Sequence, residues 1–166
     1  ETNPGGIWLA PEIHEAQKAF IDRTKIHTAA IATDHAVCKI RVDLTSVEDL
    51  DAKITAVFTP ATFKGKLQTF TQDGKLTAGA NSATLSCRIE EPKLWWTHDM
   101  GKPDLYEVQV SVTAGKKQLD AVTETVGVRT IEVRDWIFHL NGRRLYIKGN
   151  NYAPADTRIA TVTHKL

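Results

Sequence analysis

The sequence predicts an all-β protein, an antiparallel sandwich of about seven strands in two sheets. Apolar and polar residues alternate with a period of two in several segments of roughly 6–10 residues, and glycine, proline and Asp or Asn separate these segments. No helical period is convincing before Asp135. At 166 residues the chain is long enough to bury a core without disulfide support.

In chain order, the first strand signal follows Gly5-Gly6 and surrounds Trp8, where Pro11 confines it to the edge or end of a sheet. Residues 20–31 alternate irregularly up to a turn at Thr33-Asp34. Residues 36–44 are regular, with charged residues between apolar ones, which is typical of a strand with one wet face. The inward positions of that strand are Cys38, Ile40, Val42 and Leu44.

The next strands are bounded by turn residues. Residues 51–58 alternate and end at Pro60, and residues 66–71 form a short strand before a tight hairpin at Asp73-Gly74. Residues 82–90 form another strand, which Pro92 closes. The predicted inward residues of these strands are Ala52, Ile54, Ala56, Phe58, Leu85, Cys87 and Ile89.

An aromatic segment at residues 95–106 precedes the strand at residues 105–113, whose inward residues are Tyr106, Val108, Val110 and Val112. A polar tip at residues 115–117 leads to a return strand at residues 118–133. The inward positions of that strand change phase, which predicts a β-bulge near Arg129. Asn141-Gly142, between two apolar runs, predicts a further hairpin.

Composition narrows the function classes. No apolar run reaches the roughly 18 residues of a membrane helix, so no membrane partner is expected. Lys plus Arg number 21 and Asp plus Glu number 20, interspersed along the chain, so no basic face and no nucleic-acid partner are predicted. The six histidines are scattered and no phosphate loop or Ser/His/Asp arrangement appears. We therefore expect no metal, no cofactor and no catalytic residue in this chain.

Two cysteines, Cys38 and Cys87, fall on inward positions of two predicted strands. They are either small buried hydrophobic residues or a cross-strand disulfide. Sequence cannot fix the register between the strands, so both interpretations stay open.

The motifs together resemble the middle of the family two glycoside hydrolases, especially the branch of β-mannosidases and exo-glucosaminidases, and β-galactosidases are related. The resemblance covers nearly the whole chain, although Thr97 stands where that branch often has Pro and Tyr152 where it often has Trp. The matching segments are Gly6-Ile7-Trp8, Trp95-Trp96 through Tyr106, Val126-Gly127-Val128-Arg129, Leu140-Asn141-Gly142, Ile147-Lys148-Gly149 and Asn151-Tyr152 with Pro154-Ala155-Asp156.

The resemblance implies three parts. Residues 1–15 are the end of a jelly-roll domain with its linker, residues 16–134 are an immunoglobulin-like β-sandwich, and residues 135–166 are a hairpin and the first strand of a truncated catalytic (β/α)8 barrel. The jelly-roll and barrel domains of the same parent chain, and the parent's carbohydrate substrate, are the implied partners. Because such enzymes in polysaccharide-degrading bacteria are often periplasmic or secreted, the resemblance also implies a periplasmic or secreted location.

The function implied by the resemblance is that of a non-catalytic spacer in a retaining exo-glycosidase that cleaves O-glycosidic bonds. Its two catalytic glutamates, roughly 5–5.5 Å apart, would lie on later barrel strands. Asn151, Tyr152 and Asp156 would lie near substrate only in the intact enzyme, at the carboxyl end of the first barrel strand.

Trp95 and Trp96 admit a second function. Flat indoles are suited to stacking on sugar rings, so the alternative is a stand-alone carbohydrate-binding or adhesive sandwich with this pair as its platform. The favoured interpretation is that the pair plugs the end of the sandwich or packs on a neighbouring domain.

Overall fold

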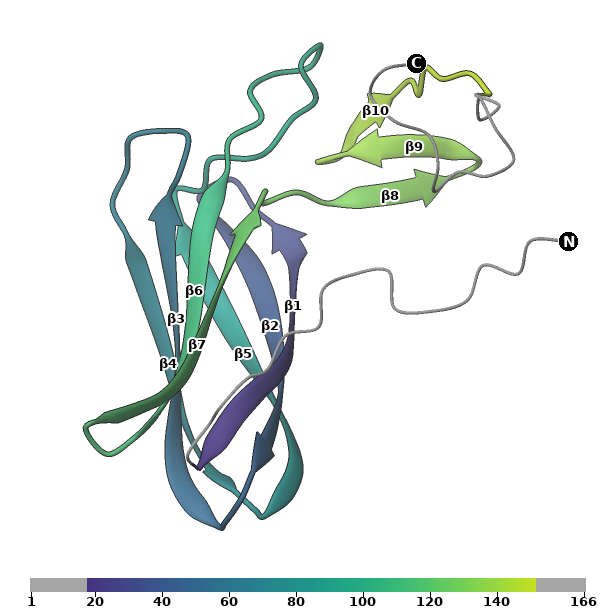
Figure 1. Cartoon of the computed structure of the whole chain (residues 1–166). Helices are drawn as coiled ribbons and strands as arrows, with labels where there is room; N and C mark the ends of the chain where they lie inside the picture. The colour runs from purple at the N-terminus through teal and green to yellow at the C-terminus, as the bar shows by residue number, and fades with distance from the viewer. Residues whose placement is uncertain (1–17, 152–166) are drawn as a thin grey trace, which may run out of the picture. The chain divides into compact units, whose positions relative to one another are not determined.

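The structure, a computed structural model, describes residues 18–151, and the chain divides into two compact units at Thr130 and Ile131. In the first unit the alternating segments form a sandwich of seven strands, which confirms the predicted all-β class (Figure 1). These strands are β1 (Ala19–Ile31), β2 (His35–Ser46), β3 (Leu50–Pro60), β4 (Gln68–Leu76), β5 (Gly79–Glu90), β6 (Tyr106–Ala114) and β7 (Lys117–Val126).

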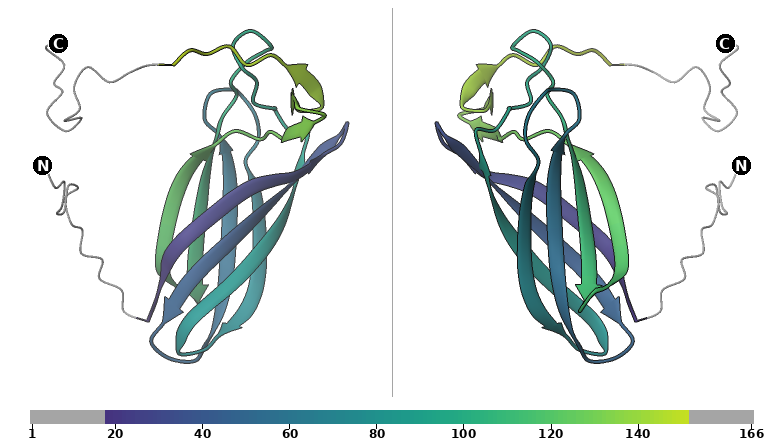
Figure 2. Two further views of the ribbon diagram at one scale, coloured as in Figure 1. Left: turned by 90° about the vertical axis from the view of Figure 1, so that its right-hand side faces the viewer. Right: turned by 90° about the vertical axis from the view of Figure 1, so that its left-hand side faces the viewer.

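Two antiparallel sheets make up this sandwich. One has the order β1-β2-β5 and the other the order β4-β3-β6-β7. Figure 2 shows the strands of both sheets running along the long axis of the sandwich. The inner faces bury all the inward residues predicted for β2, β3, β5 and β6. Phe58 lies within this core, in edge contact with the rings of Phe70 and Tyr106.

Side chains join the edge strand β1 to the edge strand β7. Asp120 Oδ2 accepts a hydrogen bond of 2.8 Å from the backbone N of Ile21, and Thr24 Oγ1 donates to the Glu124 carboxylate. A β-bulge at residue 22 interrupts the β1–β2 ladder next to Ile21. Because edge N–H groups invite pairing with other chains, these contacts also protect the edge of the first sheet.

The predicted hairpin at Asp73-Gly74 is wrong. β4 continues through both residues to Leu76, paired with β3 throughout, with Lys53 opposite Asp73. The chain then crosses to the other sheet and enters β5 at Gly79, whose φ is +99°. Pairing along the whole of β3 outweighs the local turn preference of an Asp-Gly pair.

The predicted bulge near Arg129 is also wrong. β7 ends at Val126, and Ile131 begins a strand that pairs in the second unit. The change of phase therefore marks the end of one sheet and the start of another. The register shift of the β6–β7 ladder lies instead at Leu119, close to the hairpin tip.

The second unit contains β8 (Ile131–Arg134), β9 (Ile137–Leu140) and β10 (Arg143–Leu145), in the order β10-β9-β8. Asn141 and Gly142 connect β9 to β10 with φ values of 49° and 77°, which confirms the predicted hairpin. Asp135 and Trp136 connect β8 to β9 with φ values of 48° and 64°. This second turn carries no glycine, so the sequence offers no comparable signal for it.

Cys38 and Cys87 lie directly opposite each other on β2 and β5, and both are buried free thiols. The backbone N of Glu91 donates to Asp34 O at 2.8 Å, which makes that opposed pair a hydrogen-bonded one. Counting along the ladder, the cysteines occupy the same type of pair, in which side chains lie farther apart than in the alternate type. The structure therefore supports the interpretation of the two cysteines as small buried hydrophobic residues, and not the cross-strand disulfide.

Burial raises the pKa of both thiols, that of Cys87 from 9.0 to about 12. The folded state therefore holds the Cys87 proton more tightly than the unfolded chain does. We expect this contribution to be fully present below pH 9 and to be lost as the pH rises toward 12. In urea unfolding at pH 8 and pH 11, the wild type should lose more stability than Cys87→Val, which has no thiol to titrate. Equal losses would contradict the assignment.

Candidate functional site at one end of the sandwich

The predicted aromatic residues lie in the long connection between β5 and β6, at the end of the sandwich that also carries the β3–β4 loop (Figure 1). We call residues 95–106 the aromatic corner. Its backbone is held at both ends, because Trp95 N donates to Val128 O and Trp96 N donates to Lys102 O, each at 3.0 Å. Within the corner, the N–H groups of Met100 and Gly101 both donate to Thr97 O and form a tight turn.

Each indole lies against a different glycine. A Cβ on Gly127 would come within 2.7 Å of Trp95 Cβ and Cγ, and a Cβ on Gly101 within 2.9 Å of Trp96 Cγ. The guanidinium of Arg129 lies 4.7 Å from the Trp95 ring centroid, a cation–π geometry. Both indoles are half-buried. The structure thus gives each ring a packing partner, and their use as a sugar platform stays a prediction.

Tyr106 links the corner to the core. Its Oη accepts a hydrogen bond of 2.9 Å from the backbone N of Lys93, thirteen residues upstream. Its ring makes edge contacts with Phe63, at 4.9 Å between centroids, and with Phe58. Burial raises the pKa of this phenol, so it remains a protonated structural group. Sandwich domains use such a tyrosine to fix the entry of a strand.

We expect Tyr106→Phe to lower the free energy of unfolding by roughly 1–2 kcal/mol, because it leaves the half-buried N–H of Lys93 without its acceptor. Urea unfolding followed by tryptophan fluorescence measures the loss. Tyr146→Phe is the matched control, since that side chain is exposed. A Tyr106→Phe variant as stable as this control would contradict the role assigned to Oη.

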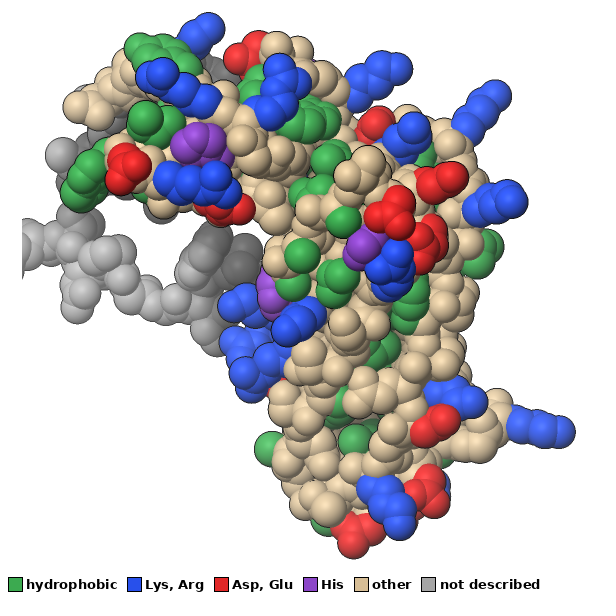
Figure 3. Space-filling model, turned by 180° about the vertical axis from the view of Figure 1, so that it is seen from behind, with side chains coloured by type: hydrophobic (Ala, Val, Ile, Leu, Met, Phe, Trp, Pro, Cys, Tyr) green, Lys and Arg blue, Asp and Glu red, His purple; other side chains and the backbone are tan. Residues whose placement is uncertain are grey.

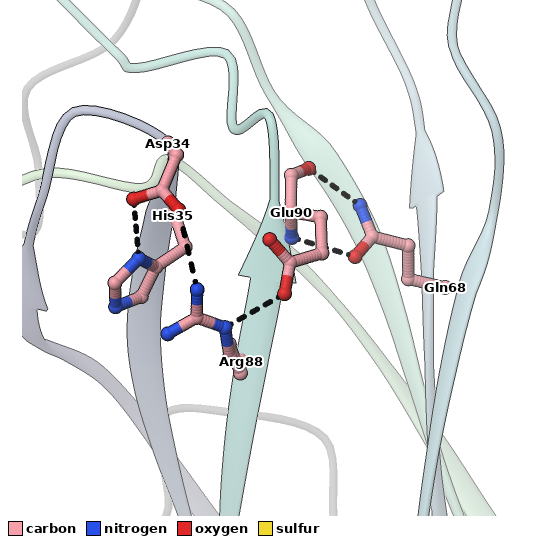
Figure 4. A network of polar contacts seen from close by, with 5 residues as sticks. All are labelled: Asp34, His35, Gln68, Arg88 and Glu90. Carbon is pink, nitrogen blue, oxygen red and sulfur yellow. Dashed lines mark hydrogen bonds and ion pairs between the residues drawn. The ribbon is translucent and has the colours of Figure 1, made fainter.

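A polar network occupies the same end of the sandwich (Figure 4). Asp34 contacts His35 Nδ1 at 2.7 Å and Arg88 Nη2 at 3.3 Å, and Arg88 Nε contacts the Glu90 carboxylate at 2.7 Å. The Gln68 amide exchanges two hydrogen bonds with the backbone of Glu90. This exchange connects β4 to β5, and so joins the two sheets on the side away from β1 and β7.

The electrostatics of Asp34 and Asp43 do not suit acid catalysis. The hydrogen bond from His35 is the main cause that lowers the pKa of Asp34. Hydrogen bonds from Arg41, Ser82 and Arg23 lower that of Asp43 to about 2. A glycosidase general acid needs the reverse, a carboxyl group whose pKa is raised. These two groups are therefore structural anions.

A cleft of about 490 Å³ opens beside the corner, between the β3–β4 loop and residues 90–93. The cleft is lined by the aromatic rings of Phe63 and Tyr106 and by three lysines, one of which is Lys64. Its carboxylates belong to Glu90 and Glu91. Glu90 is already paired with Arg88. No nucleophile and base face each other in this cleft, so its described residues form a surface groove without a catalytic arrangement.

Most of the substrate-adjacent residues predicted from the sequence fall outside the part of the chain that the structure describes. Asn151 is exposed at the end of the described residues, whereas Tyr152, Asp156 and Trp8 lie outside them. Among residues 18–151, no three His, Cys, Asp or Glu side chains gather as metal ligands. Nor does any helix in that range have the length and apolar character needed to cross a bilayer.

Arg129 and the network around Asp34 have little signal in the sequence. The alternating pattern predicts that Arg129 lies within a strand, whereas its side chain is exposed and lies over Trp95. Gly127, in an apolar strand-like run, is a weak sign of a close backbone approach. Arg88 and Glu90 alternate on a wet strand face, which indicates exposure and no particular partner.

Comparisons with known proteins agree with one another. The family model for glycosyl hydrolases family 2 matches residues 19–129. The β-mannosidase B of Emericella nidulans is 29% identical over 169 residues, covering 95% of this chain, and that of Aspergillus niger is 32% identical with the same coverage. The chain spans 19% of the length of each of these relatives.

Solved structures share the fold. The β-D-mannosidase of Dictyoglomus thermophilum superposes with a TM-score of 0.73 at 22% identity, covering 86% of this chain and 18% of that one. A putative β-galactosidase from Bacteroides fragilis superposes with a TM-score of 0.65 at 20% identity, covering 78% of this chain and 20% of that one.

Proposed function

Because the chain belongs to family 2 of the glycosyl hydrolases, we propose that it is a non-catalytic spacer of a larger glycosidase. Its function is to hold neighbouring domains of the parent in position around an active site that other residues form. The parent is a retaining exo-glycosidase that hydrolyses O-glycosidic bonds, of the β-mannosidase or β-galactosidase type. The names and the 19% share of the β-mannosidase relatives support this proposal.

The observation that carries the proposal is the one-sided sheet of the second unit. Residues two apart on a strand share a face, so the register puts Ile131, Val133, Phe138 and Leu140 on one face and Glu132, Arg134, His139 and Ile137 on the other. Leu140 is buried, whereas Ile131, Val133 and Phe138 are 56%, 57% and 38% exposed. An exposed apolar sheet face is typical of a surface that another part of a protein covers.

The proposed partners are those that the family resemblance implies. A jelly-roll domain would precede residue 16 and a catalytic barrel would include residues 135–166, with Asn151, Tyr152 and Asp156 near the parent's carbohydrate. The parent would act outside the cytoplasm, as a periplasmic or secreted enzyme. In the spacer role, the aromatic corner packs and does not bind sugar.

A titration separates this function from that of a stand-alone carbohydrate-binding sandwich, the alternative that the half-buried indoles of Trp95 and Trp96 favour. The chain is titrated calorimetrically with neutral manno-, galacto- and glucosamine oligosaccharides. We expect no saturable heat. Saturable binding that disappears in Trp95→Ala or Trp96→Ala, but persists in a variant of the exposed Trp136, would replace the spacer function with the binding one.

A further inference from the structure

The outer face of the β1-β2-β5 sheet gathers cations that are far apart in the sequence. Three rows cross the sheet: Arg23–Asp43–Ser82, Lys25–Arg41–Thr84 and His27–Lys39–Ser86. Figure 3, seen from behind, shows Lys and Arg side chains gathered beside a histidine on this side of the molecule. We call these rows the basic face. The interspersed charges of the sequence predicted no such face, because only the register of the strands assembles it.

The register places like charges directly opposite each other. Lys25 lies opposite Arg41, and Lys39 is the neighbouring cation on the same face, opposite the imidazole of His27. Opposed like charges destabilise a sheet, whereas opposite charges at such positions contribute roughly 0.2–1 kcal/mol. Folding alone gives no reason for this arrangement, and an anionic ligand would remove its cost.

The carboxylate of the basic face is already engaged. Asp43 contacts Arg23 at 3.1 Å and Arg41 at 2.8 Å, and accepts a hydrogen bond from Ser82 at 2.8 Å. Within the described part of the chain, Lys25 and Lys39 have no carboxylate within 4.0 Å. Two exposed ammonium groups therefore remain available on one face.

The third column of the basic face is a line of exposed hydroxyl groups on β5, from Ser82, Thr84 and Ser86. The three rows of the basic face contain no Phe, Tyr, Trp or large aliphatic side chain. Protein–protein interfaces use such side chains as anchors at their core. Proteins that bind single-stranded nucleic acids use aromatic side chains to stack on the bases. The face instead combines cations with hydroxyl groups, which suits an acidic, hydroxyl-rich ligand.

We propose that the basic face binds an anionic glycan, a polymer whose sugar units carry carboxylate or sulfate groups. Lys25 and Lys39 supply the charge, and the hydroxyl groups of Thr84 and Ser86 on β5 hydrogen-bond the sugar. The net charge of +1 for the whole chain gives little general attraction for duplex DNA, so the local cluster carries the binding. This activity is separate from the spacer function and uses a different part of the sandwich from the aromatic corner.

The test measures binding of the intact chain to polygalacturonate, dextran sulfate and neutral galactomannan at 20 and 150 mM NaCl. We expect binding to one or both polyanions, weakened by salt, and none to galactomannan. Lys25→Glu combined with Lys39→Glu should weaken it at least tenfold. The matched control, Lys64→Glu combined with Lys66→Glu, makes the same change in net charge at the β3–β4 loop and should have less than a threefold effect.

Binding to polygalacturonate or to dextran sulfate identifies the acidic group as carboxylate or sulfate. The proposal is overturned by no binding at 20 mM NaCl, by equal losses in the two double variants, or by equal affinity for galactomannan. Duplex DNA bound as tightly as the polyanionic glycans at the same salt would also overturn it. No binding to the polyanions, or equal losses in the two double variants, leaves the expected result with neutral oligosaccharides unchanged, so in these outcomes the basic face fails while the spacer function stands.

Discussion

Replacing Phe58 by alanine is expected to lower the free energy of unfolding by about 3–5 kcal/mol. The side chain is 1% exposed, on the central strand β3. Its ring centroid lies 5.8 Å from that of Phe70 and 6.1 Å from that of Tyr106. The interplanar angles of 86° and 75° make both contacts edge-to-face. The substitution removes the buried apolar surface, leaves a cavity between the sheets and deletes both aromatic contacts.

Urea unfolding followed by fluorescence measures this effect, and Phe138→Ala serves as the control. Phe138 lies in the second unit and is 38% exposed, so its loss should change the unfolding of the sandwich by less than about 0.5 kcal/mol. A Phe58→Ala variant that loses less than about 2 kcal/mol would mean that the sheets close around the cavity, contrary to the packing described.

Replacing Gly127 by alanine is expected to cost about 1–3 kcal/mol, because the added Cβ would lie 2.7 Å from Trp95 Cβ and Cγ. One of the two backbone segments must move, and the cation–π contact with Arg129 is disturbed with it. Gly74→Ala is the matched control. Its Cβ would meet no atom within 4 Å, so it should be neutral or stabilising by up to roughly 1 kcal/mol.

A double-mutant cycle identifies the cause of the Gly127→Ala effect. In a Trp95→Gly background both the Cβ and the Cγ that the new Cβ would strike are absent, so Gly127→Ala should then cost less than about 0.5 kcal/mol. The same loss in both backgrounds would show that the contact with Trp95 is not the reason for glycine at this position.

Strands with one buried face were predictable from the sequence. The inward residues of β2, including Ile40 and Val42, are correct because an alternation of apolar and charged residues can bury only one face. Asn141-Gly142 was predictable for a different reason, since the φ values above zero at both positions suit that pair. Asp73-Gly74 carries the same kind of local signal and failed, because pairing with a distant strand decided the conformation.

The candidate sites depended on contacts between residues far apart in sequence. Arg129 contacts the ring of Trp95 just after β7 ends at Val126. No periodic pattern in the sequence indicates this contact. The basic face requires the β1–β2 register, including the bulges that set which side of β1 carries Lys25 and His27. Composition and spacing do not contain this information, which arises when the sheets pair.

The most direct test of the central claim is the turnover of p-nitrophenyl β-D-mannopyranoside and β-D-galactopyranoside by the purified 166-residue chain. A non-catalytic spacer predicts that p-nitrophenol appears no faster than in buffer, at any protein concentration. Release of p-nitrophenol that increases in proportion to the concentration of the chain, and that stops when the chain is unfolded in urea, would contradict the claim. It would show that the chain itself carries an active site.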